Sequence, residues 1–183
     1  MTDDDARQLI LREVGPAEHL VWAGAPREGL VLRPSDAAMI PFSLMWGGFT
    51  FFWEASVIQS NAPFFFRLWG IPFVAAGIYL IVGRFFVDAY MRKRMAYGFT
   101  DQRVIILSGG WSGVKSLPLD TLSDLTLTEK GDGSGTITLG PASPWAAYPL
   151  GLRGYRAPAA PAFEFIENAR QVYTRLREAQ AAT

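Results

Sequence analysis

The sequence predicts a membrane protein of mixed α+β class, in which a transmembrane helical hairpin precedes a small β-rich domain with a C-terminal amphipathic helix. Three observations predict this fold. Two long apolar runs are separated by a short polar turn, several short β-branched runs follow them, and the last segment has apolar residues at helical spacing. Half of the residues are hydrophobic and 19% are charged, against about 25% in soluble domains.

The N-terminal residues 1–36 are expected to form a cytoplasmic segment. Their acidic start, Asp3–Asp5, lacks the positive charge and apolar core of a signal peptide. The same aspartates can cap a short helix, which the pair Gly15-Pro16 would end. The apolar runs His19–Ala23 and Gly29–Leu32 predict either a small hairpin or an extended piece near the bilayer.

Residues 37–90 are expected to form the transmembrane hairpin, with helices at about 37–58 and 64–87. At 1.5 Å per residue the first run is roughly 33 Å long, enough to cross a ~30 Å hydrocarbon layer. The alternative is two buried helices of a soluble core, but a chain this short has too little polar surface left to cover both. Gly47 and Gly48 would let another helix approach closely, so we consider them candidates for partner contacts.

Basic residues near the helix ends predict the orientation of this hairpin. The turn between the helices has no Lys or Arg, and only Arg67 lies on that side. The opposite side has more, namely Arg27, Arg33, Arg92, Lys93, Arg94 and Arg103. By the positive-inside rule, both termini are expected in the cytoplasm, with the turn outside.

Residues 94–183 are expected to form a cytoplasmic domain. Strands are predicted at 95–100, at 103–107 and at 114–119, where Pro118 favours a sheet edge, and a hairpin joins 122–129 to 136–139. An irregular connection, 140–161, is rich in Pro and Gly, and its aromatic residues are candidates for partner contacts: Trp145, Tyr148 and Tyr155. An amphipathic helix is predicted over 162–180.

Two short segments carry a resemblance to a known family. Glu18–Pro26 reads EHLVWAGAP, and Tyr97–Ile106 reads YGFTDQRVII. Together they resemble bacterial membrane proteins with a pleckstrin-homology (PH)-like domain, the YdbS-like or bacterial PH-domain family. The resemblance implies a PH-like barrel or sheet capped by the C-terminal helix, a place in the bacterial inner membrane, and a scaffold or binding role. It also implies that Thr100 and Arg103 stabilise a turn.

Charged residues inside or beside the apolar runs are the candidates for a site. Glu54 lies within a predicted membrane helix, where an ionisable residue suggests function. We favour an ion pair with Arg67 across the hairpin over a proton or ligand site. Arg84 and Asp88, four residues apart, are expected to pair within their helix. The basic residues after the second helix are expected to contact lipid headgroups: Arg92, Lys93 and Arg94.

Composition excludes several classes of chemistry. The chain has no cysteine, which excludes disulfides and thiolate sites, and its single histidine, His19, excludes a metal centre with several histidines. The formal net charge of zero provides no field to attract nucleic acid. The glycines of 131–135 lack the Gly-Lys-Ser/Thr ending of a phosphate loop, so they predict a hairpin turn. We therefore expect no catalytic residue, metal or cofactor.

The sequence favours a non-enzymatic, membrane-anchored scaffold, accessory subunit or interaction module. Its expected partners are the lipid bilayer and other membrane proteins or a second copy of the chain, without nucleic acid. It is expected to be a multi-pass protein of the inner (cytoplasmic) membrane. Two alternatives stay open at this point: a small membrane enzyme or transporter component that uses Glu54 and Arg67, and a domain that senses anionic lipids.

Overall fold

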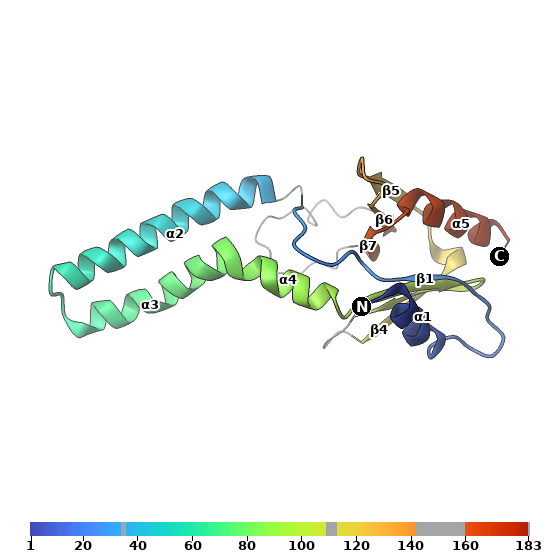
Figure 1. Cartoon of the computed structure of the whole chain (residues 1–183), viewed down its shortest axis with the longest axis horizontal. Coiled ribbons are helices and arrows are strands. Elements are labelled where there is room, and N and C mark those ends of the chain that lie inside the picture. The colour runs from blue at the N-terminus through green and yellow to red at the C-terminus, as the bar shows by residue number, and fades with distance from the viewer. Residues whose placement is uncertain (34–35, 109–112, 142–159, 183) are drawn as a thin grey trace. The chain divides into compact units, whose positions relative to one another are not determined.

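The computed structural model describes residues 1–33, 36–108, 113–141 and 160–182 and shows a mixed α+β protein (Figure 1). The chain divides into two compact units. We call the first the strand unit; it contains the described residues of Met1–Gly29, Ala89–Ala146 and Gly154–Thr183. The second, the hairpin unit, contains those of Leu30–Asp88. Residues 1–29, expected as a separate segment, thus belong with the C-terminal domain.

The first sheet of the strand unit has four antiparallel strands in the order β1-β2-β3-β4. Their bounds are β1 Leu20–Gly24, β2 Ala96–Thr100, β3 Arg103–Leu107 and β4 Val114–Pro118. The three later strands lie where the sequence predicts them, and β4 with its proline is at an edge. β1 pairs with β2, with Gly24 opposite Tyr97, and not with residues 29–32 as a local hairpin would. This long-range pairing attaches the N-terminal residues to the domain.

The second sheet has three antiparallel strands, β5 (Leu125–Glu129), β6 (Gly135–Leu139) and β7 (Ala162–Ile166). The β5–β6 hairpin confirms the prediction, including the turn at the glycines of 131–135. The predicted helix over 162–180 is wrong at its start, because its first residues form β7, which pairs with β6. Helix α5 (Ala169–Ala181) follows this strand. Phe163 and Ile166 are fully buried, and Asn168 at φ 49° separates strand from helix.

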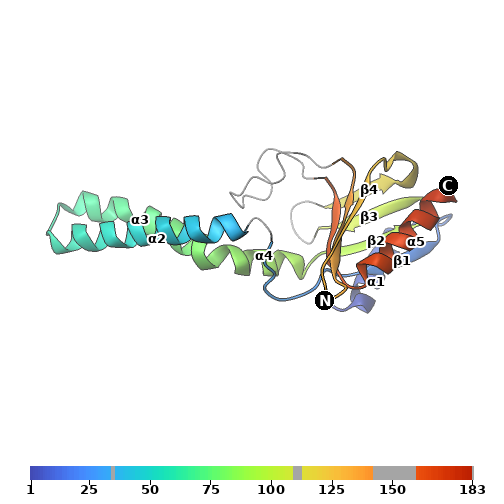
Figure 2. The same ribbon diagram turned by 90° about the horizontal axis from the view of Figure 1, so that it is seen from above.

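One hydrophobic core lies between the two sheets and α5. It includes Tyr97, Phe99, Val104, Ile137, Phe163, Ile166, Val172 and Leu176. In Figure 2 the strands of the second sheet run across those of the first. Helix α1 (Asp3–Leu11) covers the other face of the first sheet through Ala6 and Ile10. Gly98 permits this approach, because a Cβ there would lie 2.7 Å from Ile10 Cγ2.

The hairpin unit consists of two helical arms that lie side by side in both views (Figures 1 and 2). The first arm is α2 (Asp36–Gln59). The second runs without a break through α3 (Phe64–Ile78), a π-helical turn (Tyr79–Gly83) and α4 (Arg84–Arg92). Both predicted helices are therefore present. The last residues of α4, from Ala89 on, belong to the strand unit.

Among the described residues, one helix is long and apolar enough to cross a membrane, namely the 29-residue arm Phe64–Arg92. The sequence predicts two such helices. The α2 arm falls short of this criterion, since it contains Asp36 and Glu54 besides several hydroxyl and glycine residues. The hairpin is thus present as a helical structure, and one of its arms has the composition of a membrane span.

Candidate functional site

The outer surface of the hairpin unit is apolar. Large hydrophobic side chains on both arms are exposed, for example Phe64 at 75%, Ile71 at 56% and Ile78 at 52%. Others on the same arms are Met45, Phe49, Phe52, Ile58, Leu68, Trp69, Val82 and Phe86. A soluble protein rarely exposes so continuous an apolar surface. Among the described residues, most of the exposed large hydrophobic side chains lie on these two arms.

The inner surface of the hairpin consists mainly of small and polar residues, together with the apolar side chains of Met39 and Ile81. Ser43, Gly47 and Thr50 are buried on α2 at helical spacing, and Gly77 faces them from α3. A Cβ at Gly77 would lie 3.2 Å from Gly47 Cα, so the two backbones are in close contact. The hydroxyls of Ser43 and Thr50 each donate to a carbonyl of their own helix at 2.9 Å. The arms therefore pack through small residues, as membrane helices do.

This packing separates the predicted partner contacts. Gly47 contacts the second arm of its own chain, whereas nothing lies within 4 Å of a Cβ placed at Gly48. Gly48 is therefore the glycine of this pair that stays open on the outer surface. The three aromatic candidates Trp145, Tyr148 and Tyr155 lie outside the described residues.

Glu54 and Arg67 do not form the expected ion pair. Among the described residues, the hydrogen bond of Arg67 is from Nη2 to Asn61 Oδ1, at 3.3 Å. The Glu54 carboxylate instead packs on Gly70, where a Cβ would lie only 1.7 Å from Oε2. Glu54 Oε2 and Arg67 Nε are both buried and have no hydrogen-bond partner. Gly70, on which Glu54 packs, follows Arg67 by about one helical turn on α3.

The base of the hairpin carries two ion pairs between its arms. Arg33 Nη2 is 2.9 Å from Asp88 Oδ1, and Arg84 Nη1 is 3.2 Å from Asp36 Oδ1. The expected pair between Arg84 and Asp88 within one helix is replaced, because the start of the first arm brings an opposite charge to each of them. The Arg84 side chain is only 10% exposed, and its Nε and Nη2 have no hydrogen-bond partner.

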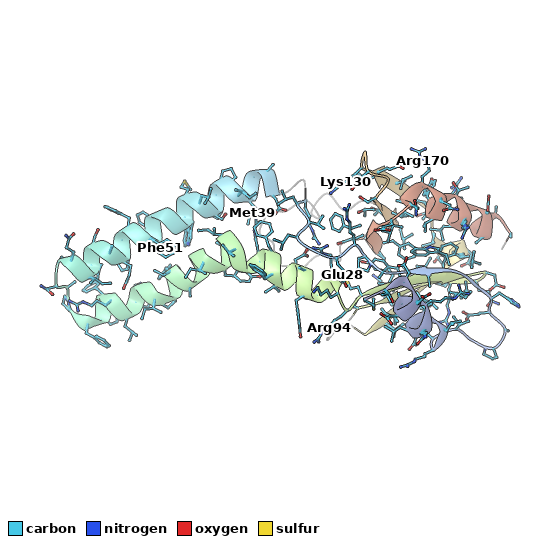
Figure 3. The ribbon with its side chains drawn as sticks, viewed as in Figure 1. Glu28, Met39, Phe51, Arg94, Lys130 and Arg170 are labelled. Carbon is cyan, nitrogen blue, oxygen red and sulfur yellow. The ribbon has the colours of Figure 1, made fainter. Side chains whose placement is uncertain are left out.

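Arg92 is buried and cannot contact lipid headgroups. The prediction of headgroup contact is therefore wrong for this one of the three basic residues. It is 1% exposed, and its guanidinium donates to the carbonyls of Arg27 (2.9 Å) and Gly29 (2.8 Å). It also lies over the Phe165 ring, 5.4 Å from the centroid. Lys93 and Arg94 are exposed, and Arg94 projects away from the ribbon in Figure 3.

The turn between β2 and β3 binds the N-terminal segment to the first sheet. Thr100 Oγ1 accepts the amides of Gln102 (3.2 Å) and Arg103 (3.0 Å), which closes the turn. Asp101 Oδ1 accepts the His19 amide at 2.9 Å, and this bond is the main cause that lowers the pKa of Asp101. The prediction that Thr100 stabilises the turn therefore has a direct structural counterpart.

Arg103 reaches further than this turn. Its Nε is 3.0 Å from Glu18 Oε2, and its Nη2 donates to the Glu13 carbonyl at 2.9 Å. The two segments that carry the family resemblance are thus neighbours in space. Sequence reasoning missed this contact, although the opposite charges of Glu18 and Arg103 were a signal for it.

Asp132 fixes the β5–β6 turn and connects it to the residues before the hairpin unit. Its Oδ1 accepts the Ser134 hydroxyl (2.6 Å) and amide (3.1 Å), and its Oδ2 accepts Arg27 Nη1 at 2.6 Å. Hydrogen bonds from Ser134, then the one from Arg27, lower the pKa of Asp132 from 3.8 to about 2. This contact therefore holds the β5–β6 turn against Arg27.

In the part of the chain that the structure describes, no three His, Asp or Glu side chains gather as a metal site would require. Comparison of the chain with models of known families, with curated proteins and with solved structures gives no match. The features that bear on function are therefore the exposed apolar side chains of the hairpin and the charged residues at its ends.

Proposed function

We propose that the chain is a membrane-anchored interaction module of the bacterial inner membrane, in which the hairpin unit is embedded in lipid and the strand unit lies in the cytoplasm. The observation that carries this proposal is the inverted polarity of the hairpin. Most of its large apolar side chains are exposed, and the buried positions of its arms are mainly glycine and hydroxyl residues, with Met39 as an apolar exception. Lipid covers such an outer surface without the free-energy cost that water would impose.

The dimensions of the second arm support the proposal. Trp69 and Tyr90 are 56% and 57% exposed. They lie roughly 32 Å apart along the helix at 1.5 Å per residue, close to the thickness of a hydrocarbon layer. Aromatic residues of this kind are enriched at the two interfaces of a membrane. The exposed Lys93 and Arg94 just beyond Tyr90 favour the cytoplasm for that end and hence for both termini.

The α2 arm enters the bilayer in this proposal as the partner of the more apolar arm. Its polar groups Ser43, Thr50 and Glu54 face the inter-helix groove, while Met45, Phe49 and Phe52 face outward. Packing against the second arm shields these polar groups from lipid. Hence a helix that is marginal alone can span the membrane as half of a hairpin.

The strand unit is proposed to be a PH-like domain with a binding or scaffolding role and no reaction of its own. Four plus three antiparallel strands around one core, closed by α5, support this interpretation. Its buried polar side chains, Arg92, Thr100 and Ser134, bond to neighbouring atoms of the same unit. The proposed partners are other membrane proteins or a second copy of the chain, which would contact the open surface at Gly48.

Fractionation of cells that produce the full chain tests the anchoring. We expect the chain to sediment with membranes, to resist extraction at alkaline pH and to dissolve only in detergent. In mild detergent it should co-purify with other membrane proteins or as an oligomer, and a monomer at every detergent concentration would argue against the interaction role. A chain that stays in the supernatant after ultracentrifugation without detergent would refute the anchoring itself.

A second candidate function is favoured by the unpartnered atoms of Glu54 and Arg67, which are costly in a hydrocarbon environment. We propose as this alternative a small membrane enzyme or transporter component that uses them for a proton or an anion. Reconstituted vesicles should then conduct protons or anions, and Glu54→Gln should stop the flux while the folded amount is unchanged. If Glu54→Gln lowers only the folded amount, the two residues have a structural role.

A further inference from the structure

The residues at the end of the second arm, Tyr90–Arg94, form a basic segment whose side chains the structure describes. Three consecutive basic residues occur here, and the structure assigns them different environments. The guanidinium of Arg92 is occupied by two backbone carbonyls and an aromatic ring of the strand unit. Whatever ligand this segment binds must therefore be bound by the two residues that follow.

Arg94 is exposed but held in place. Its guanidinium lies over the Tyr90 ring, 4.4 Å from the centroid, and its Nη2 donates to the Tyr90 hydroxyl. Stacking on an aromatic ring restrains a long side chain, so less rotamer entropy is lost when a ligand binds. The other N–H groups of the guanidinium form the planar fork that suits two oxygens of a phosphate.

Lys93 is exposed next to Arg94 but has a competing charge. The carboxylate of Glu28 is close enough that the charge of Lys93 contributes to lowering the pKa of Glu28, after the larger effects of the N-terminal ammonium. An anion near Lys93 is therefore also repelled by Glu28. The two basic residues should contribute unequally, with Arg94 dominant.

We propose that Tyr90, Lys93 and Arg94 form a binding site for the headgroup phosphate of anionic phospholipids, with Arg94 as its principal ligand. The inference rests on the proposed function, because a helix that crosses the bilayer must end in the headgroup layer where these residues lie. Tyr90, exposed and amphipathic, suits that layer. Each basic residue near an anionic leaflet is worth about a fivefold gain in lipid association.

The position of Arg177 provides a matched control. Arg177 is exposed near the C-terminal end of α5. That end binds the carbonyls of Leu119 and Leu122 through Gln180, and the Leu119 amide in turn binds Gln102 in the β2–β3 turn. Arg177 therefore lies near the β2–β3 turn, at one end of the first sheet. Arg94 precedes the start of β2, at the opposite end of that strand. Its loss removes the same charge at a different place.

The test uses the full chain in lipid nanodiscs made from phosphatidylcholine and phosphatidylglycerol. After mild detergent extraction, native mass spectrometry measures how strongly the anionic lipid is enriched among the lipids that stay bound. We expect Arg94→Gln to reduce the enrichment about fivefold. Lys93→Gln should reduce it less, and Arg177→Gln should leave it unchanged. An equal loss in all three variants, or no loss in Arg94→Gln, would overturn the site.

Two further measurements distinguish a lipid ligand from a soluble phosphate, and the headgroup site from the membrane anchor. Inorganic phosphate at constant ionic strength should not displace the bound phosphatidylglycerol. Displacement would show that a soluble phosphate is the ligand and would overturn the assignment to lipid. Resistance of each variant to alkaline extraction, measured on the same membranes, reports the anchoring. If enrichment is absent while this resistance persists, the headgroup site is wrong and the membrane anchor stands; if resistance is lost in the unmodified chain, the anchor fails and the site with it.

Discussion

Arg84 and Arg92 are eight residues apart on one continuous helix, yet they differ in their burial and in their hydrogen-bond partners. Arg92, in the strand unit, is fully buried and makes two hydrogen bonds to carbonyls as well as an aromatic contact. Arg84, in the hairpin unit, is 10% exposed, pairs with the Asp36 carboxylate and lies over the Phe85 ring, while its Nε and Nη2 have no hydrogen-bond partner. The guanidinium of Arg92 is therefore bonded within the strand unit, whereas that of Arg84 leaves two nitrogens of the hairpin unit without hydrogen bonds.

The same contrast holds for apolar residues. In the strand unit Phe99, Phe163 and Ile166 are inside, as water requires. In the hairpin unit most large apolar side chains are exposed, and small residues such as Gly47 and Gly77 are buried. The two units thus differ in the kind of side chain that they bury, and the boundary between them lies within α4. This contrast is what the proposed lipid environment of the hairpin unit and an aqueous environment of the strand unit would require.

The largest effect is expected from Arg92→Leu. The substitution removes the buried guanidinium that donates to the carbonyls of Arg27 and Gly29, and a hydrogen bond to a charged group is worth about 1.5–3 kcal/mol. We expect the strand unit to lose about 3 kcal/mol of unfolding free energy, visible as faster amide hydrogen exchange in β2 and β7. Arg94→Leu, which removes an exposed guanidinium, should exchange like the unmodified chain. Equal rates in both variants would contradict the integrated role of Arg92.

Substitution of Gly77 by alanine should affect the hairpin unit next. The new Cβ would lie 3.2 Å from Gly47 Cα and 3.1 Å from Thr50 Oγ1, so the arms must separate. Overpacking of this kind costs about 1–3 kcal/mol. Thermal unfolding in detergent should occur at a lower temperature for Gly77→Ala, whereas Gly48→Ala, with open space around it, should be neutral. A larger loss in Gly48→Ala would mean that the arms pack through the other face.

A smaller effect is expected from Arg103→Gln. It removes the bonds to Glu18 and to the Glu13 carbonyl, which are partly exposed, so about 1–2 kcal/mol is at stake. The loss should be local, with faster hydrogen exchange at residues 13–20 and little change in the second sheet. Uniform acceleration throughout the strand unit would show instead that Arg103 supports the whole core.

The smallest effect concerns Asp132 and acid. Its pKa is lowered in the folded chain, to about 2 from 3.8, so the ionised form stabilises the fold above pH 3.8. That contribution is lost as the pH falls from 3.8 through about 2. Asp132→Asn should therefore be slightly less stable than the unmodified chain near neutral pH and should lose less stability below pH 3.8. Parallel curves of stability against pH for the two proteins would contradict this assignment.

Much of the fold could be predicted from local signals. The β-branched run Arg103–Leu107 and the alternation around the glycines of 131–135 predict β3 and the β5–β6 hairpin. The start of the last helix could not be predicted, because the apolar residues of 162–166 suit either a helix or a strand, and only pairing with β6 decides between them. The pairing of β1 with β2 is equally non-local, since the two strands are separated by the whole hairpin.

The candidate residues show the same limit. The exposed apolar residues of the hairpin agree with the sequence argument that a chain this short has too little polar surface to cover both apolar runs. The partners of charged residues do not follow from the sequence in this way, because they depend on which helix faces which. Arg84 and Asp88 turn to Asp36 and Arg33, and Arg92 turns into the strand unit instead of toward headgroups. Spacing within one helix carries no information about these contacts.

The absence of cysteine in the chain allows a direct measurement of where the hairpin lies. Single cysteines introduced at Ile71, Ile78 and Ser60 can be treated with a membrane-impermeant maleimide on intact cells and again after detergent is added. If the hairpin spans the bilayer, Ser60→Cys reacts from outside, whereas Ile71→Cys and Ile78→Cys react only after detergent. Rapid labelling of Ile71→Cys and Ile78→Cys without detergent would contradict the membrane position of the hairpin.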